Sequence, residues 1–210
     1  MPVLSEPTTK RAIAFIDGQN LFRAAKQAFG YTYPNYDVAA LALTVAGDHS
    51  WDLLGTRFYT GVPDALDDAT WNHFWTAKLL QMSRQGVGTF SRSLRYRNKL
   101  VRLRDGTEQT ILVGQEKGID VRLALDIVAV AYQGEADVLL VFSQDQDLSE
   151  VATEVRQIAK KQKRWIKMAS AFPVSAASTN RRGINGTDWI KIDRALYDSC
   201  LDRRDYRLKS

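Results

Sequence analysis

The sequence predicts an α/β domain in which helices cover both faces of a mostly parallel central sheet. Two observations support this prediction. Short apolar runs alternate with segments of helical spacing for most of the 210 residues. The run ADVLLVFS, at 136–143, holds five consecutive large apolar residues, which is typical of a strand covered on both faces. Such an alternation of strands and helices favours a three-layer fold.

The first half of the chain contains two predicted strands and three predicted helices. A strand at 11–16 precedes a helix at 21–29, in which apolar residues recur at helical spacing. The next helix, at about 38–46, follows a candidate N-cap, Asp37. A strand at 53–59 then precedes a helix at about 66–85, which ends at the glycines of 86–88. Most tryptophans of the chain are expected to lie in the core.

The second half begins with residues 93–114, which alternate on both sides of Asp105-Gly106 and so predict a β-hairpin or ribbon. The elements expected after it are a deeply packed helix at 119–133, the strand at 136–143, an amphipathic helix within 144–161, a strand at 164–171, a polar loop at 175–185 and a last strand or turn at 187–193. Residues 11–193 thus form the predicted domain. Residues 1–10 are expected to be a flexible tail, and 194–210 a charged tail or helix.

Bulk properties exclude several classes of protein. The chain has no run of 18 apolar residues and its first residues lack the apolar core of a secretion signal, so we expect no membrane span. Cys200 is the single cysteine, which excludes an intrachain disulfide and fits a reducing, cytoplasmic location. The formal net charge of +5 is compatible with a nucleic-acid partner.

Acidic side chains stand where predicted strands end. Asp17 follows the first strand, with Asn20 three residues later; Asp145 and Asp147 follow the strand at 136–143; and Asp120 opens the helix at 119–133. Ligands of parallel α/β sheets bind beyond the carboxyl ends of the strands. Two carboxylates 4 Å apart repel by roughly 4 kcal/mol at an effective dielectric of about 20, so a cluster of them requires cations or protons. An all-oxygen site of this kind suits Mg²⁺ or Mn²⁺, which support phosphodiester hydrolysis.

Each of these residues also has a structural interpretation. Asp17, directly before a glycine, favours a turn. Helix capping is an alternative role for Asn20, Asp120 and Asp147, the last as part of a capping box with Glu150. Of the four acidic residues, Asp145 has the weakest structural alternative, because a carboxylate just after a deeply buried strand is rarely needed for the fold.

Asp126, the two histidines and the absence of two phosphate-binding motifs narrow the possible chemistry of the site. Asp126 is expected to be structural, because it points about 120° away from Asp120 on the same helix. His49 and His73 are the only histidines and neither follows a strand, so a catalytic triad or a histidine-based metal site is not expected. The chain also lacks a GxxxxGK[ST] phosphate loop and a complete GxGxxG motif.

Basic residues of the predicted ribbon are candidates for phosphate contact. Arg95, Arg97 and Lys99 alternate and therefore share one face of a strand, which could follow a phosphate backbone. The alternative is a solvated edge strand protected from aggregation. Further nucleic-acid-binding candidates are Lys117, Arg181 and Arg182.

Three motifs in order, FIDGQN, EKGIDVRLALD and LLVFSQDQDL, resemble the NYN domain family of the PIN-like nuclease superfamily, in particular its bacterial LabA-like branch. The resemblance covers about residues 11–193. It implies a Rossmann-like, PIN-like α/β fold and a metal-dependent ribonuclease. The family's acidic positions fall on Asp17, Asp120, Asp145 and Asp147, and its polar partner on Asn20. The family's S-G-D-S-D-F is altered here by Gln144, Gln146 and Leu148, and the bulkier glutamines are expected to narrow the mouth of the site or reset its substrate choice.

The resulting hypothesis is a metal-dependent endoribonuclease that acts on RNA, single-stranded rather than paired. Asp17, Asp120 and Asp145 would bind Mg²⁺ or Mn²⁺, with Asp147 supporting the ion directly or through water. Asn20 would orient Asp17 or contact the scissile phosphate. Water would attack phosphorus in line. The alternatives are a non-catalytic RNA-binding regulatory module and a PIN-like DNA nuclease.

Overall fold

The computed structural model describes residues 5–102 and 106–207, without the side chains of Lys99 and Leu112. Six strands form one sheet in the order β3-β2-β1-β6-β7-β8, and every pair in it is parallel. These strands are β1 (Lys10–Asp17), β2 (Trp51–Val62), β3 (Gly88–Ser93), β6 (Val138–Phe142), β7 (Lys167–Pro173) and β8 (Asp188–Ile192). The helices are α1 (Gly18–Phe29), α2 (Val38–Asp48), α3 (Ala69–Arg84), α4 (Ile119–Gln133), α5 (Ser149–Gln162) and α6 (Arg194–Ser199). The predicted α/β fold with a parallel sheet is therefore confirmed.

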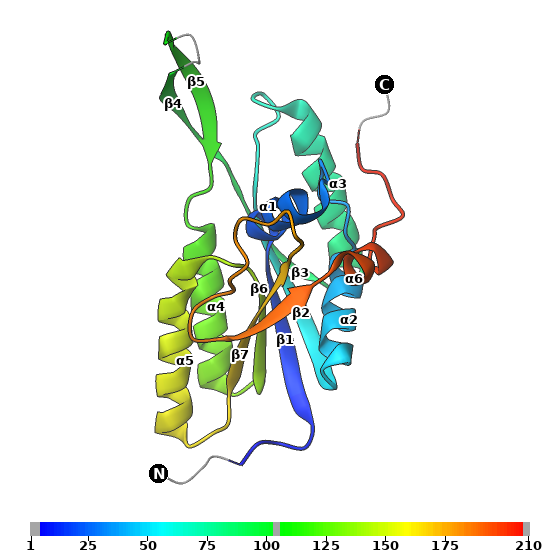
Figure 1. The fold of residues 1–210 in the computed structure, drawn as a ribbon, viewed down its shortest axis with the longest axis vertical. Coiled ribbons are helices and arrows are strands. Elements are labelled where there is room, and N and C mark those ends of the chain that lie inside the picture. The colour runs from blue at the N-terminus through cyan, green and yellow to red at the C-terminus, as the bar shows by residue number, and fades with distance from the viewer. Residues whose placement is uncertain (1–4, 103–105, 208–210) are drawn as a thin grey trace.

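Helices cover both faces of the sheet, so the core has two parts (Figure 1). Along β1, Ala14 and Ile16 pack into the cluster formed with α1, α2 and α3. Ile13 and Phe15 alternate with them and pack into the cluster formed with α4 and α5. This period-2 division explains why the central strands are apolar throughout. All five residues of β6 are buried, as the unbroken apolar run predicts.

One strand of the sheet is absent from the sequence prediction. β3 (Gly88–Ser93) pairs with β2 at the sheet edge, where the prediction has only a glycine cap and the start of the ribbon. None of its six residues is fully buried, so it carries no apolar signal.

The ribbon is present as β4 (Arg95–Arg102) and β5 (Glu108–Gln115), an antiparallel pair outside the main sheet. Its predicted turn, at Asp105, lies outside the described residues. The pair projects beyond the sheet at the end of the molecule where α1 begins (Figure 1). Because β1 ends where α1 begins, the ribbon rises from the carboxyl edge of the sheet.

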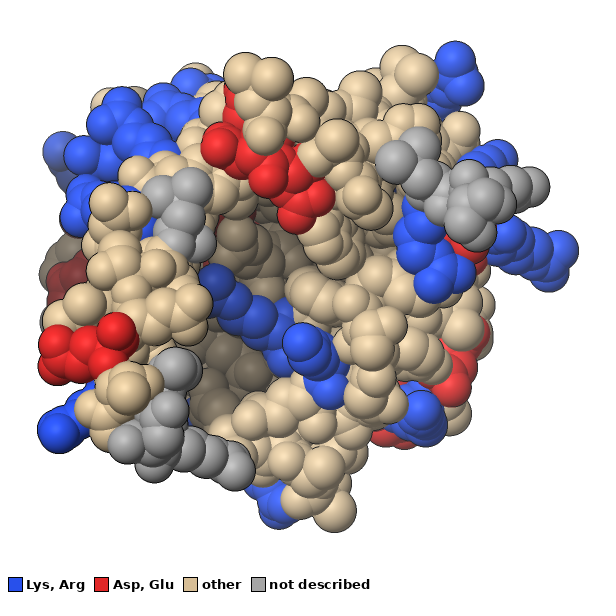
Figure 2. Space-filling view, turned by 90° about the horizontal axis from the view of Figure 1, so that it is seen from above, with Lys and Arg blue, Asp and Glu red and all other residues tan. Residues whose placement is uncertain are grey.

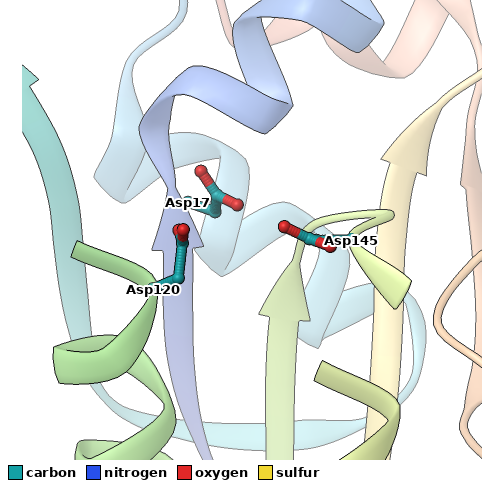
Figure 3. A group of neighbouring side chains, drawn as sticks. All are labelled: Asp17, Asp120 and Asp145. Atoms are coloured by element: carbon teal, nitrogen blue, oxygen red, sulfur yellow. The ribbon is translucent and has the colours of Figure 1, made fainter. Parts of the chain in front are cut away.

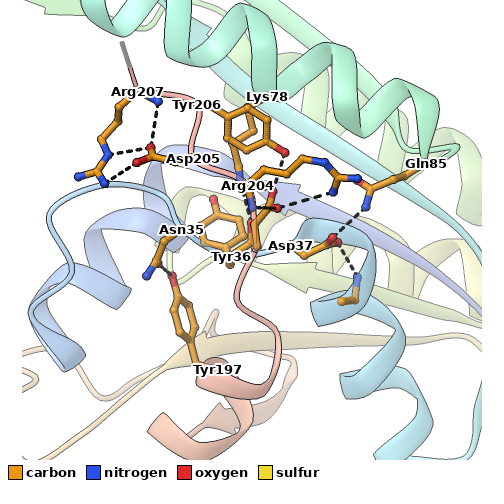
Figure 4. A network of polar contacts seen from close by, with 12 residues as sticks. Asn35, Tyr36, Asp37, Lys78, Gln85, Tyr197, Arg204, Asp205, Tyr206 and Arg207 are labelled. Carbon is orange, nitrogen blue, oxygen red and sulfur yellow. Dashed lines mark hydrogen bonds and ion pairs between the residues drawn. The ribbon is translucent and has the colours of Figure 1, made fainter. Parts of the chain in front are cut away.

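After α6 the chain crosses back over the domain and is held there by polar contacts (Figure 4). The backbone N–H of Asp37 donates to the Cys200 carbonyl, and the N–H of Asp202 donates to the Asn35 carbonyl, each at 2.8 Å. Within the described residues, no helix has the length and apolar character needed to cross a membrane.

Candidate metal centre

Three carboxylates meet at the carboxyl edge of the sheet. Asp17 ends β1, Asp145 follows β6, and Asp120 lies in the first turn of α4. One oxygen from each lies within 4.8 Å of the others, and their side chains point toward one another (Figure 3). β1 and β6 are adjacent parallel strands, so their carboxyl ends coincide. Asp147 is exposed and does not belong to this group of described residues.

Asp17 combines the capping role with a place in the cluster. One carboxylate oxygen accepts from the Asn20 backbone N–H and the other from the Ser143 hydroxyl, both at 3.0 Å. The side chain is 4% exposed. The pKa of Asp17 is raised to about 6, chiefly by burial and also by the nearby Asp120 and Asp145, against the opposing effect of the two hydrogen bonds. Asp17 is therefore the N-cap of α1 and not a turn residue, and its carboxylate is buried within the cluster.

Gly18 allows this geometry through close packing. It opens α1, and a Cβ atom there would lie 2.5 Å from the ring of Phe58 and 3.0 Å from the Tyr59 carbonyl oxygen. Phe58 is fully buried in the core, so its ring is held in place by its neighbours. A glycine after Asp17 therefore brings the start of α1 against β2.

The capping interpretations of Asp120 and Asp147 are wrong. α4 has Gly118 at its N-cap position, in the left-handed region with φ 76°, and no side chain caps it. Asp120 makes no hydrogen bond or ion pair with any described residue, and burial together with Asp145 and Asp147 raises its pKa. Asp145 is expected from the sequence to have the weakest structural role, but its carboxylate accepts a hydrogen bond of 3.0 Å from the Asp147 N–H. It therefore caps the short 3₁₀ turn Gln146–Leu148.

Asn20 and the two glutamines fix the loops around the cluster. Asn20 lies inside α1 and does not cap it; its side-chain oxygen accepts from the Gln144 N–H at 2.8 Å. The Gln144 amide donates to the Arg182 carbonyl at 2.8 Å, and the Gln146 amide to the Gly183 carbonyl at 2.9 Å. Both glutamine side chains therefore attach the acidic loop to the loop before β8. Their hydrogen-bonding groups are directed at that loop, which gives them a structural role beside the site.

The acidic cavity measures about 390 Å³, and two charged residues outside the predicted set also line it: Glu116 and Arg23. Glu116 accepts from the Gly61 N–H, and burial raises its pKa to about 7, with Asp17 and Asp120 adding to the rise. Arg23 opposes the rise at Asp120 and Glu116. The sequence signal that could have identified Glu116 is its position. It directly follows β5 and precedes Asp120 by four residues, so both acids lie in the short connection from the ribbon into the first turn of α4.

The donor set fits a hard divalent cation. Three carboxylates that converge at this distance repel one another, and the raised pKa values of Asp17 and Asp120 record that repulsion and the burial. A cation of charge +2 would remove the need for protonation, and an all-oxygen set favours Mg²⁺ or Mn²⁺ over softer metals. Asp17, Asp120 and Asp145 are therefore the residues that would hold it.

The predicted phosphate-binding residues divide into two groups. Arg95, Arg97 and Lys117 are exposed, on or beside the ribbon. The side chain of Lys99 lies outside the described part of the chain. Arg181 donates to the Ala176 carbonyl and Arg182 to the Asn185 side chain, so both guanidinium groups support their own loop.

Asp126 is remote from the cluster, as its helical position predicts. It accepts from the Tyr59 hydroxyl at 2.8 Å and forms an ion pair with Arg122 at 2.9 Å.

The chain is similar to known proteins in sequence and in fold. A sequence model of the NYN domain matches residues 11–179 of the chain. The fold is similar to the crystal structure of a protein of unknown function from Vibrio parahaemolyticus RIMD 2210633, with a TM-score of 0.50 and 17% sequence identity. That similarity covers 90% of this chain and 98% of the other. No curated protein matches the chain.

Proposed function

Since this chain belongs to the NYN domain family of PIN-like nucleases, we propose that it is a metal-dependent endoribonuclease of the LabA-like type. The observation that carries the proposal is the convergence of Asp17, Asp120 and Asp145 from three separate elements. Asp120 supports the proposal because it does not cap α4 and makes no hydrogen bond or ion pair within the described residues, yet its carboxylate lies with those of Asp17 and Asp145.

The chemistry follows from the groups that line the cavity. When bound, Mg²⁺ or Mn²⁺ acidifies a water molecule and neutralises charge on a phosphate. Asp17, held by Asn20 and Ser143, orients this site. Exposed Asp147, two residues after Asp145, would support the ion through water. Glu116, with a pKa raised to about 7, is suited to exchange a proton at neutral pH. In-line attack of water on phosphorus would form one P–O bond and break the bridging P–O bond opposite it, without a covalent intermediate; the attacking water loses a proton and the leaving ribose oxygen takes one up.

The ribbon supplies a basic surface beside the cavity. Arg95 pairs across the ribbon with Gln115, and Arg97 with Val113, so each pair shares one face. Gln115 and Val113 line the acidic cavity. The basic face of the ribbon therefore continues the cavity wall, and we assign it to the RNA backbone on either side of the cut.

The end of the molecule that carries the ribbon is hollowed, and Lys and Arg side chains lie in and around the hollow (Figure 2). The other face of the ribbon carries Tyr96, whose pKa is raised by burial and by the nearby Asp64, Asp67 and Asp68. Those carboxylates would repel phosphate. The charge distribution thus directs a nucleic acid to the Arg97 face.

Cleavage of labelled single-stranded RNA tests the function, with a matched pair of variants on α4. Asp120→Asn removes a carboxylate that makes no hydrogen bond, so the fold is expected to persist while the rate falls about 100-fold or more, that is, by ~2.7 kcal/mol. Asp126→Asn, six residues further along the helix, is expected to stay within about twofold of the wild type. EDTA should abolish the activity, and Mn²⁺ or Mg²⁺ should restore it.

Equal cleavage by wild type and Asp120→Asn would mean that the three carboxylates are not the catalytic centre. Salt-sensitive RNA binding without turnover would identify a binding module instead. Preferential cleavage of single-stranded or flap DNA in the same panel would identify a DNA nuclease.

The ribbon is tested separately through salt dependence. Arg97→Gln is expected to weaken RNA binding several-fold and to reduce the slope of log K against log salt by about 0.7, the value for one phosphate contact on a single strand. Arg102→Gln, on the same strand but the opposite face, should leave the slope unchanged. Fluorescence anisotropy over a salt series measures both. The same loss of slope in both variants would show that the ribbon binds RNA without a preferred face.

A further inference from the structure

A second cavity, of about 340 Å³, adjoins the acidic one and has no part in the chemistry described above. It lies between α1, α3 and the end of β2. Gln19 and Arg23 line both cavities, so the two share a wall. No acidic residue is among the described residues that line the second cavity.

Aromatic rings form much of its lining, contributed by Phe22, Trp71 and Trp75. Trp71 is half-buried and presents part of its surface to the cavity, whereas Trp75 is a core residue that is 7% exposed and offers the cavity only a small part of its ring. Phe74 fixes the Trp71 ring edge-on, with ring centroids 5.1 Å apart at 71°. A rigid aromatic wall of this kind is suited to a flat π-system.

Cationic side chains accompany the aromatic wall. Arg23 and Lys26 lie one turn apart on α1 and line this cavity. Arg23 is braced by a hydrogen bond of 2.7 Å to the Gln19 side chain. The combination of an apolar aromatic pocket with positive charge at the boundary of the acidic cavity matches a group that is flat and uncharged but attached to phosphates.

We propose that this cavity binds one unpaired nucleobase of the strand whose phosphate lies at the acidic cluster. The base stacks on Trp71, next to Trp75, and Arg23 holds a phosphate between the two cavities. The volume lies at the lower end of the ~300–1,000 Å³ range of ligand pockets, which suits one base and not an extended ligand. The inference rests on the proposed function only in taking a nucleic acid as the partner.

An unpaired base is needed because a paired base is stacked inside its duplex and presents no free face. Single strands are recognised by splaying bases onto aromatic side chains, and each such stack strengthens binding by roughly 5- to 150-fold. The pocket thus makes the enzyme select single-stranded or looped regions.

The test measures binding in EDTA, where no cleavage occurs, by fluorescence anisotropy of a short single-stranded RNA. Trp71→Leu is expected to weaken binding of the intact strand by roughly 10-fold, and to have little effect on a strand of the same length built from abasic nucleotides. Trp165→Leu is the matched control and should leave both affinities unchanged. Trp165 is also half-buried, but it precedes β7 and so lies at the opposite, amino edge of the sheet.

Photocrosslinking covers the case in which Trp71→Leu folds poorly. Wild-type protein irradiated with 4-thiouridine-containing RNA should yield crosslinked peptides from α1 and α3. Crosslinks confined to the ribbon, or equal losses on intact and abasic strands, would overturn the base pocket while leaving the nuclease proposal intact. Base-dependent binding together with cleavage that does not depend on Asp120 would support the base pocket and overturn the nuclease proposal.

Discussion

Replacement of Asp17 by asparagine is expected to stabilise the metal-free protein at neutral pH and to reduce metal-dependent cleavage by about 1,000-fold. The two effects have one cause. At neutral pH the Asp17 carboxylate is ionised in a buried position beside two other acids, and its pKa is raised to about 6. Asparagine keeps an oxygen for the Asn20 N–H but carries no charge, so it removes the cost of burying a charge and the smaller repulsion from the other acids, together with a metal ligand.

The sign of the pH dependence follows from the raised pKa. Between the ordinary value of 3.8 and about 6, the folded state binds more protons than the unfolded state, so the free energy of unfolding falls as pH rises through this window. A rise of about two units corresponds to ~3 kcal/mol above pH 6. The altered hydrogen bond to Ser143 offsets part of this gain, so we expect a net stabilisation of ~1–2 kcal/mol, or roughly 2–8 °C in Tm.

Thermal unfolding followed by circular dichroism in EDTA measures this gain, which should shrink as the pH is lowered from 7.5 toward 4. Added Mn²⁺ should raise the Tm of the wild type and not that of Asp17→Asn. A variant that is destabilised equally at all pH values would show that the Asp17 hydrogen bonds outweigh the repulsion. The cluster would then be a structural network.

The sequence predicts the parallel sheet and the acidic trio for related reasons. Buried central strands must be apolar, so β1 and β6 are visible as runs, and residues that follow parallel strands must meet at one edge. β3 is not predicted in this way, because its mostly exposed residues show no run or alternation of apolar side chains. Its place in the sheet depends on pairing with β2, which is a tertiary contact.

Capping and loop contacts are predicted less well, because they depend on where a helix begins to within one residue. α1 begins at Gly18, and this shift makes Asp17 and not Asn20 the cap. Glu116 reaches the cavity only because the ribbon returns to the sheet edge. Gln144 and Gln146 differ from the family pattern, and only the position of the loop before β8 shows that they attach it to the acidic loop.

Lys78 is the largest departure from sequence-based expectation. Lysine is almost never fully buried, yet this side chain is 2% exposed beneath the C-terminal segment (Figure 4). Its ammonium group donates to the Tyr36 carbonyl at 2.8 Å and lies 3.4 Å from the Asp202 carboxylate. The rings of Tyr36 and Tyr206 enclose it at 5.4 and 5.1 Å. Burial lowers its pKa, and Asp202 opposes that shift.

Lys78→Ala is therefore expected to lower the free energy of unfolding by ~3–5 kcal/mol, because it removes the buried cation beside Asp202 and leaves the Tyr36 carbonyl without a donor. The side chains that still contact the Asp202 carboxylate are then the Tyr206 hydroxyl, at 2.7 Å, and the more distant Arg204 guanidinium, at 3.9 Å. The matched control is Lys167→Ala, which breaks the Lys167–Asp188 pair. That pair is shorter, at 2.8 Å, but its side chains are 31% and 63% exposed, so its loss should cost under ~1 kcal/mol. Urea unfolding of both variants measures the difference.

The consequence of Lys78→Ala for the site depends on how far the damage extends. Tyr36 donates its hydroxyl to the Gly18 carbonyl at 3.4 Å, so the buried lysine is linked to the start of α1 and to Asp17. Lys78 also shares α3 with Trp71 of the proposed base pocket. We expect cleavage by the folded variant, assayed well below its Tm, to fall several-fold.

Lys78→Met separates charge from packing, since it keeps the buried stem but not the ammonium group. Near-wild-type stability of Lys78→Met would show that Tyr206 and Arg204 alone satisfy Asp202, and that the lysine acts there as a packed apolar chain.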